Sequence, residues 1–303
     1  MRSRSIAAGG VTLAAAIGVA AAFIAAKAQQ PAKGGVFAKN NLVAWCIVPF
    51  DAKQRGPAER AEMLQRLGIK TFAYDWREKD IPIFDQEVDE LAKRGIKLQG
   101  FWLSSGLKAE SDKNVAAVLD FLRRRKVRTQ IWYFVSAAKD LEPMSQAQKV
   151  EAVARAVGYV ATEAGKFGAS VGIYNHGGWT GEPENQIEVI RKLRMGNVGI
   201  VYNFHHGREQ MGRFPEMFVR MKPYLYCVNL NGMKEGGPMI MPIGEGDREL
   251  EMLHVIRRAS YTGPIGILNH RENVDAEVGL KQNMDGLRRL LGEMGDEMAA
   301  KTY

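Results

Sequence analysis

The strongest constraint on the fold is a repeated alternation of short apolar segments with amphipathic segments, which starts at residue 42 and continues to the end of the chain. The short segments are rich in β-branched and aromatic residues and predict eight strands: Leu42–Val48, Lys70–Trp76, Lys97–Leu103, Arg128–Val135, Val171–Asn175, Val198–Asn203, Leu225–Leu230 and Pro264–Asn269. The amphipathic segments have apolar residues at helical spacing and predict eight helices, near 58–67, 84–94, 113–125, 145–166, 185–195, 208–222, 248–259 and 276–294.

The order of strand, loop, helix and tight return predicts a parallel sheet covered by helices. Three predicted helices end at a Gly and lead at once into a strand, at Leu67-Gly68, Arg94-Gly95 and Met195-Gly196. Eight such units are the number that closes into a (β/α)8 barrel. A doubly wound open sheet is the alternative, but the first turn, Pro49–Ala52, lacks the Gly-rich sequence typical of that fold. We therefore expect an α/β protein with one TIM barrel as a single domain.

The beginning of the chain has the pattern of an export signal. Arg2 and Arg4 precede an almost wholly apolar run, Ile6–Ala26, and Ala26-Lys27-Ala28 has small residues where a signal peptidase reads them. The predicted organisation is a signal peptide at 1–28, a polar linker at 29–41 and the barrel at 42–303. The apolar run is also long enough to cross a bilayer, so an uncleaved anchor is the alternative. We expect an exported protein, periplasmic or extracellular, that meets a membrane only through an uncleaved leader.

Composition excludes several classes of protein. With 46% apolar and 25% charged residues, the chain is neither disordered nor collagen-like. The net charge is +8, and outside the leader 39 cations stand against 34 acids, an excess too diffuse to predict a nucleic-acid partner. Cys46 and Cys227 both lie in apolar segments that read as strands, so we expect two buried free thiols.

Histidines gather where predicted strands end, which is where barrels of this kind place their active sites. His176 follows the fifth strand, His205 and His206 follow the sixth, and His270 follows the eighth. Imidazole changes charge near neutral pH and binds metals when it is neutral, so this cluster predicts a functional site. Asp75 is the only clear acid at a strand end and is the expected partner of a histidine base.

Aromatic and amide side chains at the same ends predict a neutral ligand with many hydroxyl groups. The apolar face of a sugar stacks on an indole, while planar amides hold its hydroxyls. The acidic loop Gly244–Asp247 argues against a phosphate. The residues expected to bind a small carbohydrate are Trp76, Trp102, Asn175, Asn203, Asn229, Asn269 and His270.

The longest insertion at this end of the predicted barrel is the segment from Asn231 to Asp247. It is rich in Gly and Met and contains Pro238 and Pro242. Long loops at an active-site face are commonly functional, so we expect this one to fold over the pocket as a lid.

Five segments in this order resemble the xylose isomerase-like TIM barrels, also called the sugar phosphate isomerase/epimerase family. They are Val171–Gly178, Asn197–His206, Tyr226–Asn231, Pro242–Asp247 and Gly263–His270, within a resemblance that runs from about residue 42 to residue 292. The resemblance implies an enzyme that moves a proton next to a sugar carbonyl. It also implies a divalent metal held by a Glu after strand five, an Asp-x-x-His run after strand six, a His after strand seven and a Glu after strand eight.

The sequence departs from that metal site at most of its positions. Tyr174, Asn203, Asn229 and Asn269 stand where the resembled family has its other ligands, while the His of the run is retained as His206. Amide oxygens alone bind Mn²⁺ or Mg²⁺ poorly, because no carboxylate neutralises the cation. The usual metal site is therefore not expected here.

Two arrangements of the site remain open. In the first, His176, His206 and His270 hold a divalent metal such as Zn²⁺ or Mn²⁺. In the second there is no metal. His176 or His206 is then the base, with Asp75 or another imidazole as its partner, and Asn side chains stabilise an enediolate oxygen.

The predicted function is an exported isomerase, epimerase or lyase that abstracts a proton next to a sugar carbonyl. The alternative is a non-catalytic barrel that only binds a saccharide and whose metal site has decayed. A glycoside hydrolase is a third candidate, but it requires two facing carboxylates, and Asp75 is the only clear one at a strand end.

Overall fold

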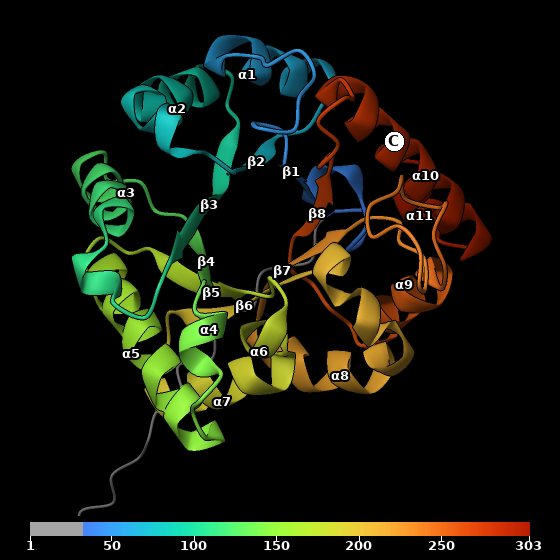
Figure 1. The fold of residues 1–303 in the computed structure, drawn as a ribbon. Helices are drawn as coiled ribbons and strands as arrows, with labels where there is room; N and C mark the ends of the chain where they lie inside the picture. Colours follow the sequence, from blue (N-terminus) through green and yellow to red (C-terminus); the bar gives the residue numbers. More distant parts are fainter. Residues whose placement is uncertain (1–32) are drawn as a thin grey trace, which may run out of the picture.

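The computed structural model describes residues 33–303, so the predicted signal peptide and the start of the predicted linker lie outside the described residues. The described chain forms a closed barrel in which each parallel strand pairs with the next and β8 pairs with β1 (Figure 1). The strands are β1 Leu42–Trp45, β2 Thr71–Tyr74, β3 Lys97–Ser105, β4 Gln130–Val135, β5 Ser170–Tyr174, β6 Val198–Asn203, β7 Leu225–Leu230 and β8 Ile265–Leu268.

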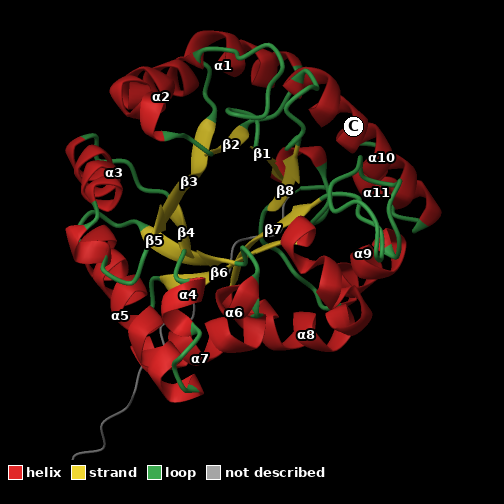
Figure 2. Cartoon of the chain, in the orientation of Figure 1, coloured by secondary structure: helices red, strands yellow, loops and turns green. Residues whose placement is uncertain are grey.

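Helices surround the strands as an outer ring (Figure 2). The α-helices are α1 Pro57–Arg66, α2 Phe84–Lys93, α3 Lys113–Arg124, α4 Ala138–Leu141, α5 Gln146–Gly165, α6 Gly178–Gly181, α7 Pro183–Leu193, α8 Phe214–Met221, α9 Glu249–Arg258, α10 Ala276–Glu293 and α11 Glu297–Ala300. Short 3₁₀ helices are η1 Lys39–Asn41, η2 Glu78–Ile83, η3 Ala109–Ser111, η4 Phe204–Arg213 and η5 Lys222–Tyr224. The predicted single-domain (β/α)8 barrel is thus confirmed.

Local sequence explains where several helices begin and end. Asp112 and Ser145 cap α3 and α5 by accepting backbone N–H groups of the first turn. Gly68 and Gly95 have left-handed backbones (φ 70° and 63°), as predicted for residues that end a helix and turn the chain into a strand. The third predicted turn differs, because α7 stops at Leu193 and Arg194, not Gly196, takes the left-handed conformation.

The barrel interior is filled by aromatic side chains, and small residues on neighbouring strands make room for them. The inner cluster includes Trp45, Trp132 and Tyr174, all fully buried. A Cβ atom on Gly100 of β3 would lie 2.6 Å from the Trp132 ring, so only glycine fits beside that indole. This packing closes the interior below the carboxyl ends of the strands and leaves the chemistry to the loops above it.

β1 is shorter than predicted and ends at Trp45, because Cys46 has a left-handed backbone (φ 51°) that cannot continue the strand. Cys46 and Cys227 are buried and unpaired, as expected. Within residues 33–303, no helix is both long enough and apolar enough to cross a membrane.

Candidate active site at the mouth of the barrel

Four imidazoles form a continuous row of ring contacts across the carboxyl ends of the strands. Their ring centroids are 4.1 Å apart for His176 and His206, 3.6 Å for His206 and His205, and 4.6 Å for His205 and His270. The sequence predicted that histidines from strands five, six and eight would meet, and the structure brings them together. We call His176, His206, His205 and His270, in that order, the histidine row.

Aromatic rings close both ends of the histidine row. Phe134, on β4, lies 4.5 Å from His176, and Phe50, in the loop after β1, stacks on His270 at 3.8 Å, both between ring centroids. Trp102 of β3 and Tyr174 of β5 lie below His176 at 6.0 and 6.3 Å. The row therefore rests on an apolar floor that excludes water from one side.

The backbone fixes the row in this geometry. The Asn203 side chain caps η4 by accepting the backbone N–H of His205, so His205 and His206 stand on the first turn after β6. Gly177 and Gly178, both left-handed (φ 83° and 60°), turn the chain sharply after His176. His270 is itself left-handed (φ 46°), a strained conformation that is uncommon for a non-glycine residue and clusters at functional sites.

Burial keeps the histidine row in the neutral form. It lowers the pKa of His205 to about 3, and neighbouring imidazoles lower it further. It lowers the pKa of His270 to about 4, and the charge of Arg77 lowers it further. Burial and the charge of His205 lower the pKa of His206 strongly. Burial also lowers the pKa of His176, although its ring is the most exposed of the four. At neutral pH each ring thus has one nitrogen free to accept a proton.

A thiol joins the end of the row. The Sγ atom of Cys46 lies 3.3 Å from Nδ1 of His270, and the backbone N–H of His270 donates to the carbonyl of Cys46 at 3.1 Å. Burial, reinforced by the charge of Asp75, raises the pKa of the Cys46 thiol well above its usual value, so thiol and imidazole are both neutral. The sequence predicted Cys46 as a buried thiol inside the first strand, and no sequence signal placed it beside His270.

Asp75 lies at the end of β2, and its carboxylate is buried. One oxygen accepts the backbone N–H of Val48 at 3.2 Å, whereas Oδ2 has no hydrogen-bond partner among the described residues. Burial raises the pKa of Asp75 to about 6, partly opposed by Arg77. In the described part of the chain Asp75 makes no hydrogen bond or ion pair with any histidine, so the predicted Asp75–histidine contact is absent. The rings of the histidine row contact one another, and His270 also contacts Cys46.

Arg77 brings a positive charge to the mouth. Its guanidinium donates to the carbonyls of Asp75 and Trp76 at 2.8 and 2.9 Å and lies 5.7 Å from the centre of the Phe50 ring. Since Phe50 stacks on His270, the guanidinium lies beside that end of the histidine row. The side chain is exposed and so is accessible to a ligand.

The two tryptophans predicted to bind sugar lie on different sides of the barrel wall. Trp102 faces the mouth, half-buried, 6.0 Å from Trp45 and 6.0 Å from His176. Trp76 points outward, where it packs edge-on against Phe84 and donates its indole N–H to the Trp102 carbonyl at 2.6 Å. Only Trp102 has a face turned toward the histidine row, so we retain it alone as a stacking platform.

The four Asn side chains predicted to bind sugar are buried. Those of Asn175, Asn203 and Asn269 form hydrogen bonds with the backbone, whereas that of Asn229 does not. Asn175 bridges β5 and β6 by donating to the Asn203 carbonyl and accepting the Asn203 N–H, at 3.0 and 2.7 Å. Asn269 donates to the carbonyls of Phe50, Arg271 and Val274. Asn229 packs directly over Gly266, where a Cβ atom would lie 1.8 Å from its Oδ1. Their predicted role in sugar binding stays a prediction that this geometry does not favour.

Changing Asn269 to Ala tests this structural role. The substitution leaves three loop carbonyls without their shared donor, so we expect the free energy of unfolding to fall by about 1–3 kcal/mol. The effect should appear in chemical denaturation and not in sugar affinity measured on the folded fraction. A stable variant with weakened sugar binding would restore the original assignment.

The segment 231–247, predicted to be a lid, is attached to the barrel along its length. Gly232 pairs with Met241, the Ile243 N–H donates to Asn283 of α10, and Glu249 accepts the N–H groups of Gly244 and Gly246. The exposed residues gather at the tip, 234–239, and Glu245 is exposed beyond it. A movement of this segment therefore has to be confined to its tip, and closure over the mouth stays a prediction.

The side chains at this rim do not fit a divalent metal. Where the resembled family has a Glu and an Asp, the hydroxyl of Tyr174 accepts hydrogen bonds from Asn203 and from the Trp45 indole. The imidazoles touch ring against ring, whereas a metal needs their edge nitrogens at about 2.0–2.1 Å from one point. Across residues 33–303, no group of three or more His, Cys, Asp or Glu is placed to hold a metal, the predicted His176, His206 and His270 set included.

Comparison with known proteins identifies the fold. Neither the family models nor the curated proteins compared with this sequence give a match. Solved structures do. The IolI protein with a bound zinc is 11% identical (TM-score 0.64), with 83% of this chain and 98% of that chain covered. The 3-keto-D-glucoside 4-epimerase YcjR of E. coli is 14% identical (TM-score 0.61; 84% and 99% covered). The probable 3-DHS dehydratase AsbF of Bacillus anthracis is 15% identical (TM-score 0.64; 81% and 98% covered).

These neighbours, together with two described as xylose isomerase domain proteins, show that the chain has the xylose isomerase-like barrel fold. The resemblance inferred from sequence is confirmed at that level. The similarity covers more than four-fifths of this chain and nearly all of each neighbour.

Proposed function

We propose that this protein is a carbohydrate-active enzyme of the isomerase or epimerase type, which abstracts a proton next to a sugar carbonyl without the divalent metal of the resembled family. The single observation that carries the proposal is the histidine row, four neutral imidazoles in contact at the carboxyl ends of the strands. The shared fold supports the substrate class, because neighbours with this fold include a keto-glucoside epimerase and a ribulose epimerase.

His206 is the proposed base. It is half-buried in the middle of the row, and burial, with the neighbouring His205 and His176, lowers its pKa and keeps it neutral. The lowered pKa makes it a weak base, so the step depends on stabilisation of the enediolate that it forms. A neutral imidazole nitrogen takes the proton from the carbon next to the carbonyl. The C–H electron pair forms a C=C bond, and the π pair of the carbonyl moves to its oxygen to give an enediolate. Return of a proton to the opposite face of that carbon gives an epimer, and its addition to the former carbonyl carbon gives an isomer. His176, exposed and 4.1 Å from His206, is the proposed route by which the proton taken up by His206 exchanges with solvent.

Arg77 is the proposed stabiliser of the enediolate oxygen. The Asn175 and Asn269 side chains are engaged with the backbone, whereas the Arg77 guanidinium is exposed beside the row. A positive charge at an apolar site stabilises developing negative charge more than it does in water. Asp75, with a pKa of about 6, exchanges protons in the physiological range and is the proposed second acid–base group at the Cys46 side of the mouth.

Deuterium incorporation from solvent tests the proposal. The protein is incubated in D₂O with D-fructose, D-tagatose and a 3-keto-glucoside, and loss of the proton next to the carbonyl is followed by ¹H NMR. We expect exchange with at least one of these sugars. The second candidate function is a barrel that only binds a saccharide. It is favoured by Tyr174 and Asn203, which are hydrogen-bonded to each other where the resembled family has metal ligands. It predicts sugar binding by calorimetry with no exchange, and that result would overturn the enzyme proposal.

Chelation gives an independent prediction. Because the rim does not fit a metal, dialysis against EDTA followed by elemental analysis should leave the rate of exchange within twofold of its starting value. Activity that disappears on dialysis and returns with stoichiometric Zn²⁺ or Mn²⁺ would show that the imidazoles rearrange into a metal site.

We also propose export through residues 1–28. The pattern that supports it is the basic start, the long apolar run and the small residues at 26 and 28. The mass of the protein purified from its own cells distinguishes a cleaved form that starts at Gln29 from a retained anchor.

A further inference from the structure

Charge is divided sharply between the two ends of the barrel. The face formed by the strand starts includes the segments 33–41, 67–70, 94–96, 125–129, 166–169, 194–197, 222–224 and 259–264, which lead into β1 to β8. Together these segments contain ten Lys or Arg and no Asp or Glu. We call this surface the basic face. The loops at the opposite end, which lead from each strand to its helix, contain 11 Lys or Arg and 15 Asp or Glu.

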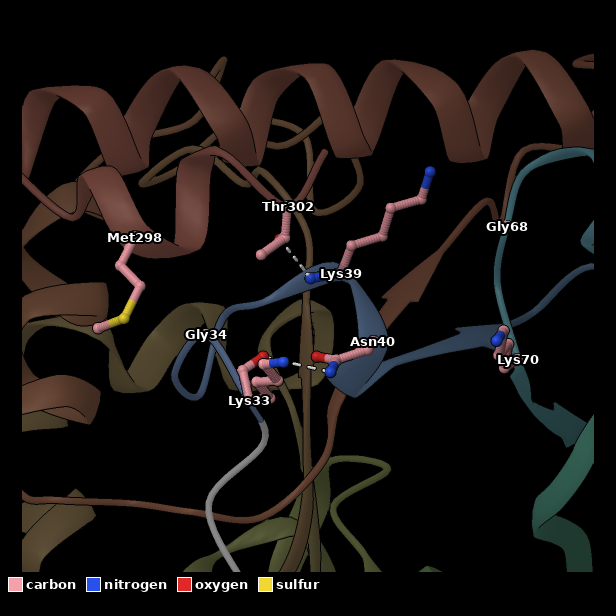
Figure 3. Close-up of a pocket in the computed structure, with 8 residues that line it drawn as sticks. All are labelled: Lys33, Gly34, Lys39, Asn40, Gly68, Lys70, Met298 and Thr302. Carbon is pink, nitrogen blue, oxygen red and sulfur yellow. Dashed lines mark hydrogen bonds between the residues drawn. The ribbon is translucent and has the colours of Figure 1, made fainter.

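The preference for cations at the C-termini of helices accounts for only part of this difference in charge between the two ends. Cations near a helix C-terminus offset the helix dipole, and Arg94 and Arg125 there are also paired with acids of α1 or α2. Lys33, Lys39 and Lys70 do not lie in the last turn of an α-helix. They line a surface pocket of about 570 Å³ on the basic face, with Gly34, Asn40, Gly68, Met298 and Thr302, and no carboxylate is among its lining residues (Figure 3).

The pocket pairs cations with an exposed apolar side chain. Figure 3 shows Lys33, Lys39 and Lys70 around it, with Met298 of α11 on its other side. The Met298 side chain is 67% exposed, the largest fraction among the large hydrophobic residues of the described chain. Amines next to an exposed apolar side chain suit a phosphate headgroup and the start of its acyl region.

The described chain begins at this same face. Lys33 lines the pocket, and only six residues separate it from Ala26, the end of the apolar run in the predicted leader. Seven chain steps span at most about 25 Å. A leader held in a bilayer therefore keeps the basic face within a few Debye lengths of the lipid headgroups, about 10 Å each at 0.1 M salt.

We propose that the basic face docks on an anionic bilayer surface, with lipid phosphates at the Lys33, Lys39 and Lys70 pocket and the histidine row turned away toward the aqueous phase. The inference rests on the proposed leader in its retained, membrane-anchored form and is independent of the proposed reaction. Its physical basis is electrostatic attraction between anionic headgroups and segments that carry ten cations and no acid, although Lys166, Arg94 and Arg125 are paired with acids of the adjacent helices. This attraction weakens as salt is added.

Lysine footprinting tests the orientation. The full chain is reconstituted in vesicles of neutral phosphatidylcholine, or in vesicles with 30% phosphatidylglycerol, and acetylated briefly before mass spectrometry. We expect acetylation of Lys39, Lys70 and Lys126 to slow at least threefold in the anionic vesicles at low salt and to recover at high salt. Lys79 and Lys139, exposed at the opposite end, are the internal controls and should react equally in both.

Charge reversal provides the matched variants. Lys70→Glu combined with Lys126→Glu should abolish the protection of Lys39, whereas Lys79→Glu combined with Lys139→Glu should preserve it; all four lysines are exposed. Equal labelling in both kinds of vesicle would overturn the proposal. Protection by RNA without protection by anionic vesicles would also overturn it, in favour of a nucleic-acid surface. Either result leaves the deuterium-exchange test of the proposed function unaffected.

Discussion

Replacing His206 by Gln is expected to slow deuterium exchange by about 100-fold or more, the range in which a positioned general base contributes to catalysis. Gln keeps a polar side chain of similar size but cannot accept the proton. His206 touches both His176 and His205, so the row should stay packed and the affinity for sugar should change little. The measurements are the exchange rate by ¹H NMR and the dissociation constant by calorimetry.

His254→Gln is the matched control. His254 is half-buried on α9 and contacts Arg257 instead of the row, so this variant should exchange at the wild-type rate. Equal slowing in both variants would point to a general loss of folded protein. An unchanged rate in His206→Gln would assign the base to another member of the row, and His176→Gln would then have to show the loss.

Replacing Asp75 by Asn is expected to stabilise the protein at neutral pH. Asp75 has a folded-state pKa of about 6, above its usual 3.8, so the fold favours the protonated acid. The stability that this group contributes is present at low pH and is lost as the pH rises through about 4 to 6. Asn cannot ionise and still offers Oδ1 to the Val48 N–H. The gain of the variant over wild type should therefore grow with pH, to about 3 kcal/mol above pH 7.

Chemical denaturation at pH 4 and pH 8 measures this difference. The control is Asp140→Asn, which replaces an exposed carboxylate on α4 and should change the free energy of unfolding little at either pH. If Asp75 also takes part in proton transfer, the stabilised variant should be the slower one in deuterium exchange. A loss of stability at pH 8 would mean that the buried Asp75 carboxylate has a partner that compensates its burial.

The barrel could be predicted because its signal is repeated along the chain. Each strand is a short apolar run and each helix an amphipathic one, so an error at one boundary leaves the count unchanged. The boundaries that failed depend on single backbone conformations. β1 ends early at left-handed Cys46, and α7 ends at left-handed Arg194, where the sequence offered Gly196 as the more probable turn residue.

The candidate site could be predicted only in part. His176, His206 and His270 were found because strand ends of a parallel barrel share one rim, which is a property of topology. The position of a residue at a strand end does not predict the direction in which its side chain points. Trp76 and Asn269 stand at strand ends as Trp102 does, yet they point into the outer packing or toward loop carbonyls. The Cys46–His270 contact joins residues 224 positions apart and depends on two left-handed backbones.

The most direct measurement is a pH titration of the histidines by ¹⁵N NMR in protein labelled at its imidazole nitrogens. We predict that His176, His205, His206 and His270 are all neutral at pH 7 and protonate below the usual histidine pKa of 6.5, with His270 near 4 and His205 near 3. Deuterium-exchange activity should then persist on the acid side of pH 6.5. Four independent titrations near pH 6.5 would show that the rings are separate and hydrated, and would contradict the histidine row as the catalytic base.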